Sequence, residues 1–263
     1  LVKAWILPLP NTVQEQLDEA IDHGFDGMIV YIDRTGQPPQ YVASGWHNKK
    51  AKIPAKPHAL FKIASISKLY DAVAVTKLVS SGRLHLDKTI AEYLPELVGR
   101  IENSDTISLR LLLQHRSGIP NFTDAPNFWA APTESYEESL ALILDKSANF
   151  EPGEDYEYCN TNYLLLNKIM DDVLGYDNFH FIQKEILMPL DLNNTFRSLD
   201  DVNMEHVMSG YHVGHPFDLK KDEHGMLATA EDVGTFVRAL NDGSLFRAGE
   251  QEIYSSIYEY EHS

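Results

Sequence analysis

A serine and a lysine three residues apart are the first side chains in this sequence that could do chemistry together. Ser65 and Lys68 lie in the segment Phe61-Lys62-Ile63-Ala64-Ser65-Ile66-Ser67-Lys68. On one helix such positions share a face, about 4.5 Å apart along the axis. A serine hydroxyl is a weak nucleophile until a base takes its proton, and a lysine amine in a dry site can be that base. The spacing therefore predicts nucleophilic attack by Ser65, against the alternative of a helix cap beside a surface lysine.

A tyrosine and an asparagine two residues apart form the second candidate pair. Tyr158 and Asn160 follow a Pro152-Gly153 turn. In an extended segment, side chains two positions apart point the same way. A phenol near a lysine can pass on a proton, and an amide can bind a substrate carbonyl. The alternative interpretation is a turn followed by a helix cap at Asn160.

The elements that must position these residues can be read from hydrophobic spacing. From Ser65 to Ser81 the apolar residues are spread widely around the helix axis, which indicates a buried helix that ends at Gly82. Other helices are predicted over Thr12–His23, Asp87–Leu97, Ser108–Gln114, Thr133–Asp145, Asn160–Leu174, Phe179–Leu187 and Thr229–Leu240. Strands are predicted over Gly27–Asp33, Gln40–Trp46 and, from an alternating pattern, Ile253–His262. Strands at both ends and helices between them predict a sheet built from the two ends of the chain, with a helical insert.

Composition excludes several classes of protein. The 263 residues are 43% hydrophobic and 23% charged, values typical of a globular chain. The formal charge of −17 repels nucleic acid and anionic lipid, and the short basic run Lys49, Lys50, Lys52 and Lys56 is interpreted as a solvated loop. No apolar run approaches the roughly 18 residues of a membrane span. We therefore expect no nucleic-acid partner and no membrane span in this chain.

Neither a disulfide nor a metal site is expected. Cys159 is the single cysteine, so an intramolecular disulfide and a cysteine-built zinc site are both excluded. His212 and His215 have a spacing that could ligate a metal, with His206 and His224 nearby, but no carboxylate framework accompanies them. These histidines are interpreted as loop residues. No cofactor is predicted.

Taken in order, the two motifs resemble those of the serine β-lactamase and penicillin-binding-protein superfamily, in its branch of class C β-lactamases, DD-carboxypeptidases and related esterases. That family carries Ser-x-x-Lys, then Tyr-x-Asn, then Lys-Thr-Gly or His-x-Gly. Four further segments resemble family motifs and stand in the same order: Gly82–Asp87, Leu111–Pro120, Met188–Leu192 and Gly225–Asp232. Cys159 departs from the serine or alanine common at the middle of Tyr-x-Asn, and is interpreted as a small packing residue.

The resemblance implies an α+β, β-lactamase/transpeptidase-like fold. An antiparallel sheet from both chain ends, flanked by helices, would carry an inserted all-helical domain. The expected boundaries are residues 1–60 and 215–263 for the sheet domain and residues 61–214 for the helical domain.

The resemblance also implies roles for single residues. Ser65 would form an acyl-enzyme, Lys68 and Tyr158 would move the proton, and Asn160 would position the substrate amide. His262 and Ser263 would be the first two residues of His-x-Gly on a strand beside the substrate. The natural polypeptide is then expected to continue beyond Ser263, beginning with glycine.

Three functions remain open at this point. One is hydrolysis of D-Ala-D-Ala-type peptides or β-lactams in the periplasm or cell envelope of a bacterium, with a signal peptide already removed. Another is hydrolysis of small esters or D-amino-acid amides at the same site. The third is a non-catalytic binding protein of the same fold, which the intact Ser65, Lys68, Tyr158 and Asn160 disfavour. His rather than Lys at position 262 disfavours an efficient lactamase, because a permanent cation would better hold a substrate carboxylate. The expected partner is a small-molecule or peptide substrate.

Overall fold

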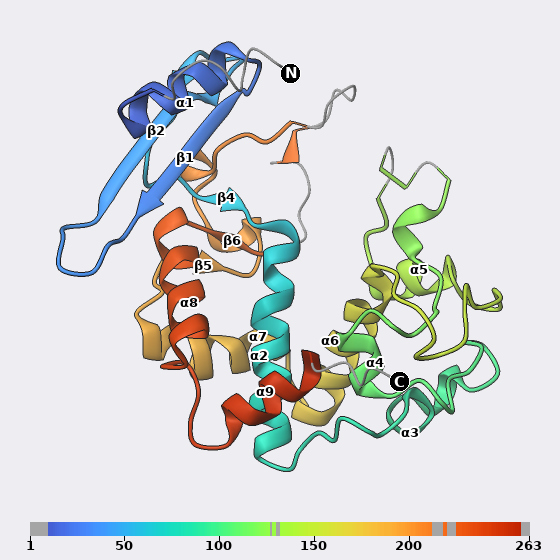
Figure 1. The fold of residues 1–263 in the computed structure, drawn as a ribbon. Coiled ribbons are helices and arrows are strands. Elements are labelled where there is room, and N and C mark those ends of the chain that lie inside the picture. Colours follow the sequence, from blue (N-terminus) through green and yellow to red (C-terminus); the bar gives the residue numbers. More distant parts are fainter. Residues whose placement is uncertain (1–9, 127, 130–131, 212–217, 220–224, 259–263) are drawn as a thin grey trace. The chain divides into compact units, whose positions relative to one another are not determined.

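A computed structural model describes residues 10–126, 128–129, 132–211, 218–219 and 225–258 (Figure 1). The chain forms two compact units. One consists of Leu1–Ala64 and Leu190–Asp242, and the other consists of Ser65–Pro189 and Gly243–Ser263.

The first unit is built around a β-hairpin. Strands β1 (Gly27–Ile32) and β2 (Gln40–Asn48) pair antiparallel, with Val30 opposite Val42, and β3 (Ile53–Pro54) adds to β2. Helix α1 (Val13–Asp22) packs against β2 and begins at a capping box formed by Thr12 and Glu15. The predicted helix and hairpin are therefore confirmed.

A second small sheet and one long helix complete this unit. The sheet has the order β4 (Phe61–Lys62), β6 (Leu227–Ala228), β5 (Thr195–Phe196), and all its pairs are antiparallel. Helix α8 (Ala230–Asp242) is capped by the Thr229 hydroxyl, as the sequence predicted. The helix packs on β1, and Gly234 permits this approach, since a Cβ there would come 2.6 Å from the Tyr31 ring.

The second unit is helical, and α2 (Ser67–Ser80) is its central element. The nine consecutive residues from Tyr70 to Leu78 are all buried, as the wide spread of apolar positions predicted. Helices α6 (Asn160–Leu174), α7 (Asn178–Ile182) and α9 (Glu250–Tyr258) pack against α2, and α4 (Leu109–Leu113) packs on α6 (Figure 1). Shorter helices are α3 (Ile90–Tyr93) and α5 (Tyr136–Ala141).

Single turns of other helix types connect these elements. The 3₁₀ turns are Ala64–Ile66, Pro95–Leu97, Phe122–Asp124, Met188–Leu190, Leu199–Asp201 and Met204–His206, and a π-helical turn spans Gln183–Leu187.

The predicted strand at Ile253–His262 is wrong over residues 253–258, which belong to helix α9. Ile253 and Ile257 are four residues apart, as are Tyr254 and Tyr258, so a helix places each pair on one face. Ile257 is fully buried, and the Tyr254 and Tyr258 rings lie 5.2 Å apart between centroids. The helix therefore gains packing that alternation along a strand would not provide.

The two compact units differ in extent from the expected domains, whose boundaries stay a prediction. The segment Leu190–Asp242 belongs to the hairpin unit, whereas residues 190–214 were expected in the helical domain. Residues 243–263 cluster with the helical unit rather than with the sheet. The physical reason for the first shift is β5, which pairs with β6 and carries its segment into the small sheet. Residues 243–258 belong to the helical unit because α9 packs on α2.

Candidate active site

Ser65 lies in the 3₁₀ turn that leads into α2. Its predecessor, Ala64, has a φ of 47°, a left-handed conformation that costs a residue with a Cβ of order 1–3 kcal/mol. The Ser65 side chain is exposed. The strained turn therefore presents a hydroxyl group at the start of a buried helix.

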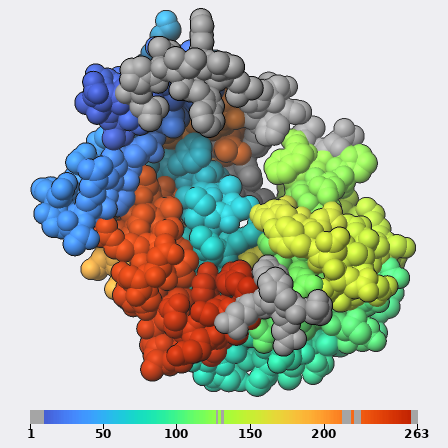
Figure 2. Space-filling model, viewed as in Figure 1, coloured from blue at the N-terminus to red at the C-terminus, as the bar shows by residue number. Residues whose placement is uncertain are grey.

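The tyrosine and the lysine both reach this hydroxyl. Tyr158 Oη donates to Ser65 Oγ at 2.6 Å, and Lys68 Nζ donates to the same oxygen at 3.3 Å. Lys68 is half-buried, whereas Tyr158 is 42% exposed. In the space-filling view, the cyan start of α2 and the yellow segment ahead of α6 lie next to one another at the surface (Figure 2). A serine hydroxyl and two groups able to exchange protons with it are thus in contact.

The Asn160 side chain joins the same cluster. Its Oδ1 accepts from Lys68 Nζ at 2.9 Å, and its Nδ2 donates to Thr123 Oγ1 at 3.1 Å and Asn121 Oδ1 at 3.4 Å. Asn121 Oδ1 also accepts from the backbone N–H of Asn160 at 3.0 Å. These bonds fix the amide with its oxygen toward the lysine, so Asn160 helps to hold Lys68 in place.

His115 supports the segment that carries Tyr158. Its ring lies 4.5 Å from that of Tyr158 between centroids, and its Nδ1 accepts the backbone N–H of Cys159 at 3.0 Å. Burial lowers the pKa of His115 to about 4, and repulsion by the Lys68 ammonium adds to the effect. The imidazole is therefore neutral at neutral pH, as acceptance of the Cys159 N–H requires.

The loop around His115 is held in a conformation that demands glycine at one position. Gly118 has a φ of 75°, and a Cβ there would come 2.0 Å from the Phe150 carbonyl oxygen. The Asn149 N–H donates to the Gly118 carbonyl at 2.8 Å. Gly118 thus lets the loop of His115 lie against the chain that leads to Tyr158.

Cys159 has the environment of a packing residue. It is buried, its Sγ donates to the Ile119 carbonyl at 3.3 Å, and burial raises the pKa of its thiol. A reactive cysteine needs the opposite shift, toward the thiolate. The interpretation of Cys159 as a small packing residue agrees with this environment.

Two further groups surround Lys68. Its Nζ lies 5.2 Å from the ring centroid of Tyr158 and 5.4 Å from that of Tyr163, within the range of cation–π attraction. Asp71 is buried one turn further along α2. Sequence reasoning missed both Asp71 and the supporting role of His115, although the three-residue step from Lys68 to Asp71 could have indicated the first.

The structure thus brings together four of the six predicted site residues, namely Ser65, Lys68, Tyr158 and Asn160. His262 and Ser263 lie outside the described residues. The segment that was expected to lead into them as a strand is helical over residues 253–258, and their assignment to a third motif stays a prediction.

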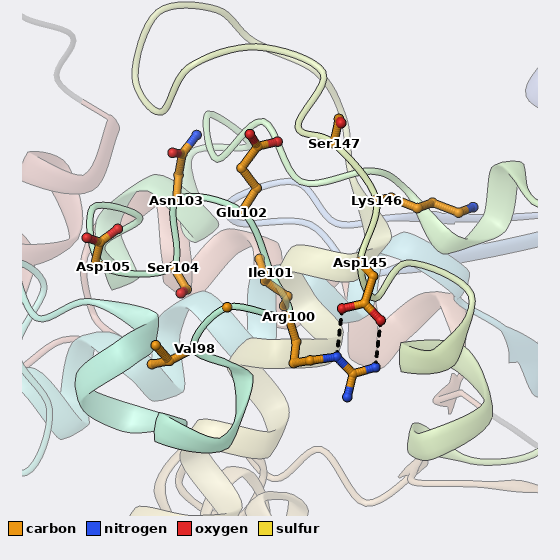
Figure 3. A pocket seen from close by; sticks show the side chains of 11 residues that line it. Val98, Arg100, Ile101, Glu102, Asn103, Ser104, Asp105, Asp145, Lys146 and Ser147 are labelled. Atoms are coloured by element: carbon orange, nitrogen blue, oxygen red, sulfur yellow. Dashed lines mark hydrogen bonds and ion pairs between the residues drawn. The ribbon is translucent and has the colours of Figure 1, made fainter.

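A separate pocket lies elsewhere in the helical unit. It has a volume of about 520 Å³, is lined by residues 98–105 and 145–147, and contains a two-pronged ion pair from Arg100 to Asp145 at 2.7 and 2.8 Å (Figure 3). None of the four clustered residues lines this pocket. Its ion pair occupies the charges of both partners, so we assign it no chemistry.

The described residues offer neither a metal site nor a membrane-spanning helix. They contain no group of three or more His, Cys, Asp or Glu side chains placed to hold a metal ion. No described helix is long and apolar enough to cross a membrane. His212, His215 and His224, weighed above as metal ligands, lie outside the described residues.

Comparison with known sequences gives one family. Residues 9–256 match the family model described as Beta-lactamase. Protein flp of Staphylococcus aureus (strain COL) is 24% identical, over 97% of this chain and 53% of its own. A putative D-alanyl-D-alanine carboxypeptidase of Escherichia coli (strain K12) is 27% identical, over 70% of this chain and 46% of its own. The chain spans about half the length of these curated relatives.

Comparison with solved structures agrees in fold. A D-amino acid amidase from Ochrobactrum anthropi SV3, in complex with L-phenylalanine amide, superposes with a TM-score of 0.80 at 26% identity, covering 92% of this chain and 73% of its own. A penicillin-binding protein homologue from Pyrococcus abyssi superposes with a TM-score of 0.75 at 24% identity, covering 93% of this chain and 59% of its own. The expected α+β, β-lactamase/transpeptidase-like fold is confirmed.

Proposed function

Because the chain belongs to the Beta-lactamase family, we propose that it is a serine hydrolase in which Ser65 is the nucleophile. The observation that carries this proposal is the convergence of Tyr158 Oη and Lys68 Nζ on Ser65 Oγ, at 2.6 and 3.3 Å. A serine needs a neighbouring base to become nucleophilic, and here two candidates for that role are already within reach.

The reaction would proceed by acyl transfer. Ser65 Oγ bonds to the substrate carbonyl carbon while its proton passes to Lys68, in its amine form, or to Tyr158, in its phenolate form. The bond from the carbonyl carbon to the leaving nitrogen or oxygen then breaks, and the leaving group takes that proton. A water molecule next bonds to the acyl carbon, the bond from that carbon to Ser65 Oγ breaks, a proton of the water passes to Ser65 Oγ, and the acid is released. The start of α2 supplies positive potential for the developing oxyanion.

The substrate class we favour is D-Ala-D-Ala-type peptides or β-lactams. Support comes from the Escherichia coli relative, which is described as a putative D-alanyl-D-alanine carboxypeptidase. The fixed amide of Asn160 would meet the amide of such a substrate. For this substrate class, the location that we propose is the periplasm or cell envelope of a bacterium.

D-amino-acid amides are the second candidate class. The observation in their favour is the superposition on a D-amino acid amidase, at a TM-score of 0.80 and 26% identity. Both classes present a carbonyl group that an activated serine could attack. They differ in what flanks that carbonyl.

A substrate panel separates these candidates. We would assay the full protein with nitrocefin, a D-Ala-D-Ala peptide, a D-amino-acid amide and p-nitrophenyl esters, and repeat each assay with Ser65→Ala. Ser81→Ala is the matched control, because Ser81 follows the last residue of α2, at the end opposite to Ser65, and its hydroxyl donates to the Leu78 carbonyl. Turnover that is lost in Ser65→Ala and kept in Ser81→Ala supports the proposal, and the preferred substrate gives the class. Undiminished turnover in Ser65→Ala would refute it.

A further inference from the structure

Three polar side chains follow one another at steps of three residues, and the last of them is a buried acid. Ser65 lies in the 3₁₀ turn before α2, and Lys68 and Asp71 lie one turn apart in α2 itself. Asp71 is only 6% exposed, although it carries a carboxyl group. The acyl-transfer steps proposed above make no use of it, yet burying an acid is costly unless something compensates.

The groups that face Asp71 come from two elements. On α2 itself, the Lys68 ammonium attracts the carboxylate. From α6, the Asn167 side chain donates a hydrogen bond to it, and Asp171 repels it. The Tyr163 phenol of α6 also lies within the electrostatic reach of Asp71.

The remaining helices against α2 bring charges that are engaged elsewhere. On α9, Glu250 pairs with Lys77, and Tyr254 and Tyr258 act on Tyr163. In the π-helical turn after α7, Lys184 and Glu185 pair with each other, and Glu185 also pairs with Arg247. On α7, His180 lies against the Tyr176 ring. Lys68 is therefore the cation that acts on Asp71 among these described groups.

The balance of these effects lets the Asp71 carboxyl group lose or gain its proton close to neutral pH. Burial is the largest effect and raises the pKa of Asp71 to about 7, against the attraction of Lys68 and the hydrogen bond from Asn167. An anion at this position stabilises a proton on Lys68, and a neutral acid does not. The same amine must be free of that proton before it can take one from Ser65.

We propose that Asp71 is a positioning residue that controls whether the Lys68 amine holds its proton, and thereby the pH range in which Ser65 is activated. Asp71 acts through Lys68 and does not touch the substrate. The catalytic consequence rests on the proposed function, whereas the coupling between the two side chains does not.

The direct test is a ¹³C NMR titration of lysine side chains in the full protein and in Asp71→Asn. Asparagine has the same shape and can still accept from Asn167, so it removes the charge with little change in packing. The Lys68 resonance is assigned by its loss in Lys68→Arg. Asp172→Asn is the matched control, because Asp172 is a more exposed acid on α6 that pairs with Lys168.

We expect Lys68 to titrate at a lower pH in Asp71→Asn than in the wild type, because the variant lacks the carboxylate charge that favours the ammonium form. In Asp172→Asn the titration of Lys68 stays at the wild-type pH. Equal Lys68 titrations in the wild type and Asp71→Asn would overturn the proposal, and so would an equal displacement in Asp172→Asn.

The kinetic test reads out the consequence separately. In Asp71→Asn, the acid limb of the acylation rate should move to lower pH together with the Lys68 titration. If the acid limb of the pH–rate profile stays in place while the Lys68 titration moves, Asp71 does not control the activation of Ser65, and that part of the proposal is wrong. If the wild type forms no adduct at Ser65, the proposed function fails, and the NMR titration still decides the coupling.

Discussion

Lys68 makes more contacts with the candidate site than the other clustered side chains. It donates to Ser65 Oγ and Asn160 Oδ1 and lies over two tyrosine rings. We expect Lys68→Ala to slow acylation by about 10²-fold or more, the usual scale for the loss of general acid–base help. Single-turnover acylation with a chromogenic ester measures the rate. Lys88→Ala is the control, because Lys88 is an exposed lysine over the Tyr93 ring. Near-normal acylation by Lys68→Ala would show that the role of Lys68 is structural and not catalytic.

Two buried groups of this unit should give opposite pH dependences of stability. Burial lowers the pKa of His115 from 6.5 to about 4, so only the unfolded chain binds that proton between these values, and stability falls as the pH is lowered through this window. Burial raises the pKa of Asp71 from 3.8 to about 7, so the folded state alone keeps that proton, and stability falls as the pH rises through that window.

Urea unfolding between pH 4 and pH 7 tests both predicted pH dependences of the free energy of unfolding. The free energy of unfolding should depend less on acidification in His115→Asn and decline less toward neutral pH in Asp71→Asn. If both variants keep the wild-type pH dependence, the two groups do not titrate as their burial requires.

At the scale of elements, a buried ion pair fastens α9 to α2. Lys77 Nζ lies 2.9 Å from Glu250 Oε2, and the two side chains are 5% and 3% exposed. Lys77 also donates to the Leu245 carbonyl, and Glu250 Oε2 accepts the Arg247 N–H. Glu250→Ala should lower the free energy of unfolding by about 3–5 kcal/mol, because it leaves the lysine charge buried without its partner.

The control for this prediction replaces the whole pair. In Lys77→Met/Glu250→Leu, no uncompensated charge remains, so we expect stability close to that of the wild type or above it. Urea unfolding measures all three proteins. A double variant as unstable as Glu250→Ala would show that packing, and not the unpaired charge, sets the cost.

Elements with one clear pattern could be predicted from the sequence, and elements with two patterns could not. Helix Asn160–Leu174 was predicted with the bounds that the structure has, because its apolar positions recur at helical spacing and Gly175 ends it in a left-handed conformation. Ile253–Tyr258 fits both an alternating strand and a helix with Ile253 and Ile257 on one face. Packing of the buried Ile257 decides between them, and a local pattern does not contain that information.

The site shows the same division. Ser65, Lys68, Tyr158 and Asn160 could be predicted because family motifs mark them along the chain. Asn121 has no such mark, and it became visible only through its bonds to Asn160. Likewise, the charge state of Asp71 depends on burial and on α6, which lies about ninety residues further along the sequence.

At the scale of the whole molecule, the fold and the family follow from the comparisons with known proteins. Over the aligned residues the relatives are about a quarter identical to this chain, and the chain spans about half the length of the curated ones. One fold supports many chemistries, because substrate choice depends on a few side chains around the nucleophile. The central claim therefore concerns the nucleophile itself.

Covalent labelling of the full protein tests that claim most directly. The protein is treated with a fluorophosphonate or a β-lactam, and the adduct is located by intact mass and peptide mapping. We predict one adduct, on Ser65, which is absent in Ser65→Ala, because Ser65 alone combines an exposed hydroxyl with Lys68 and Tyr158 in contact. An adduct on Cys159 or Ser117, or one that persists in Ser65→Ala, would contradict it.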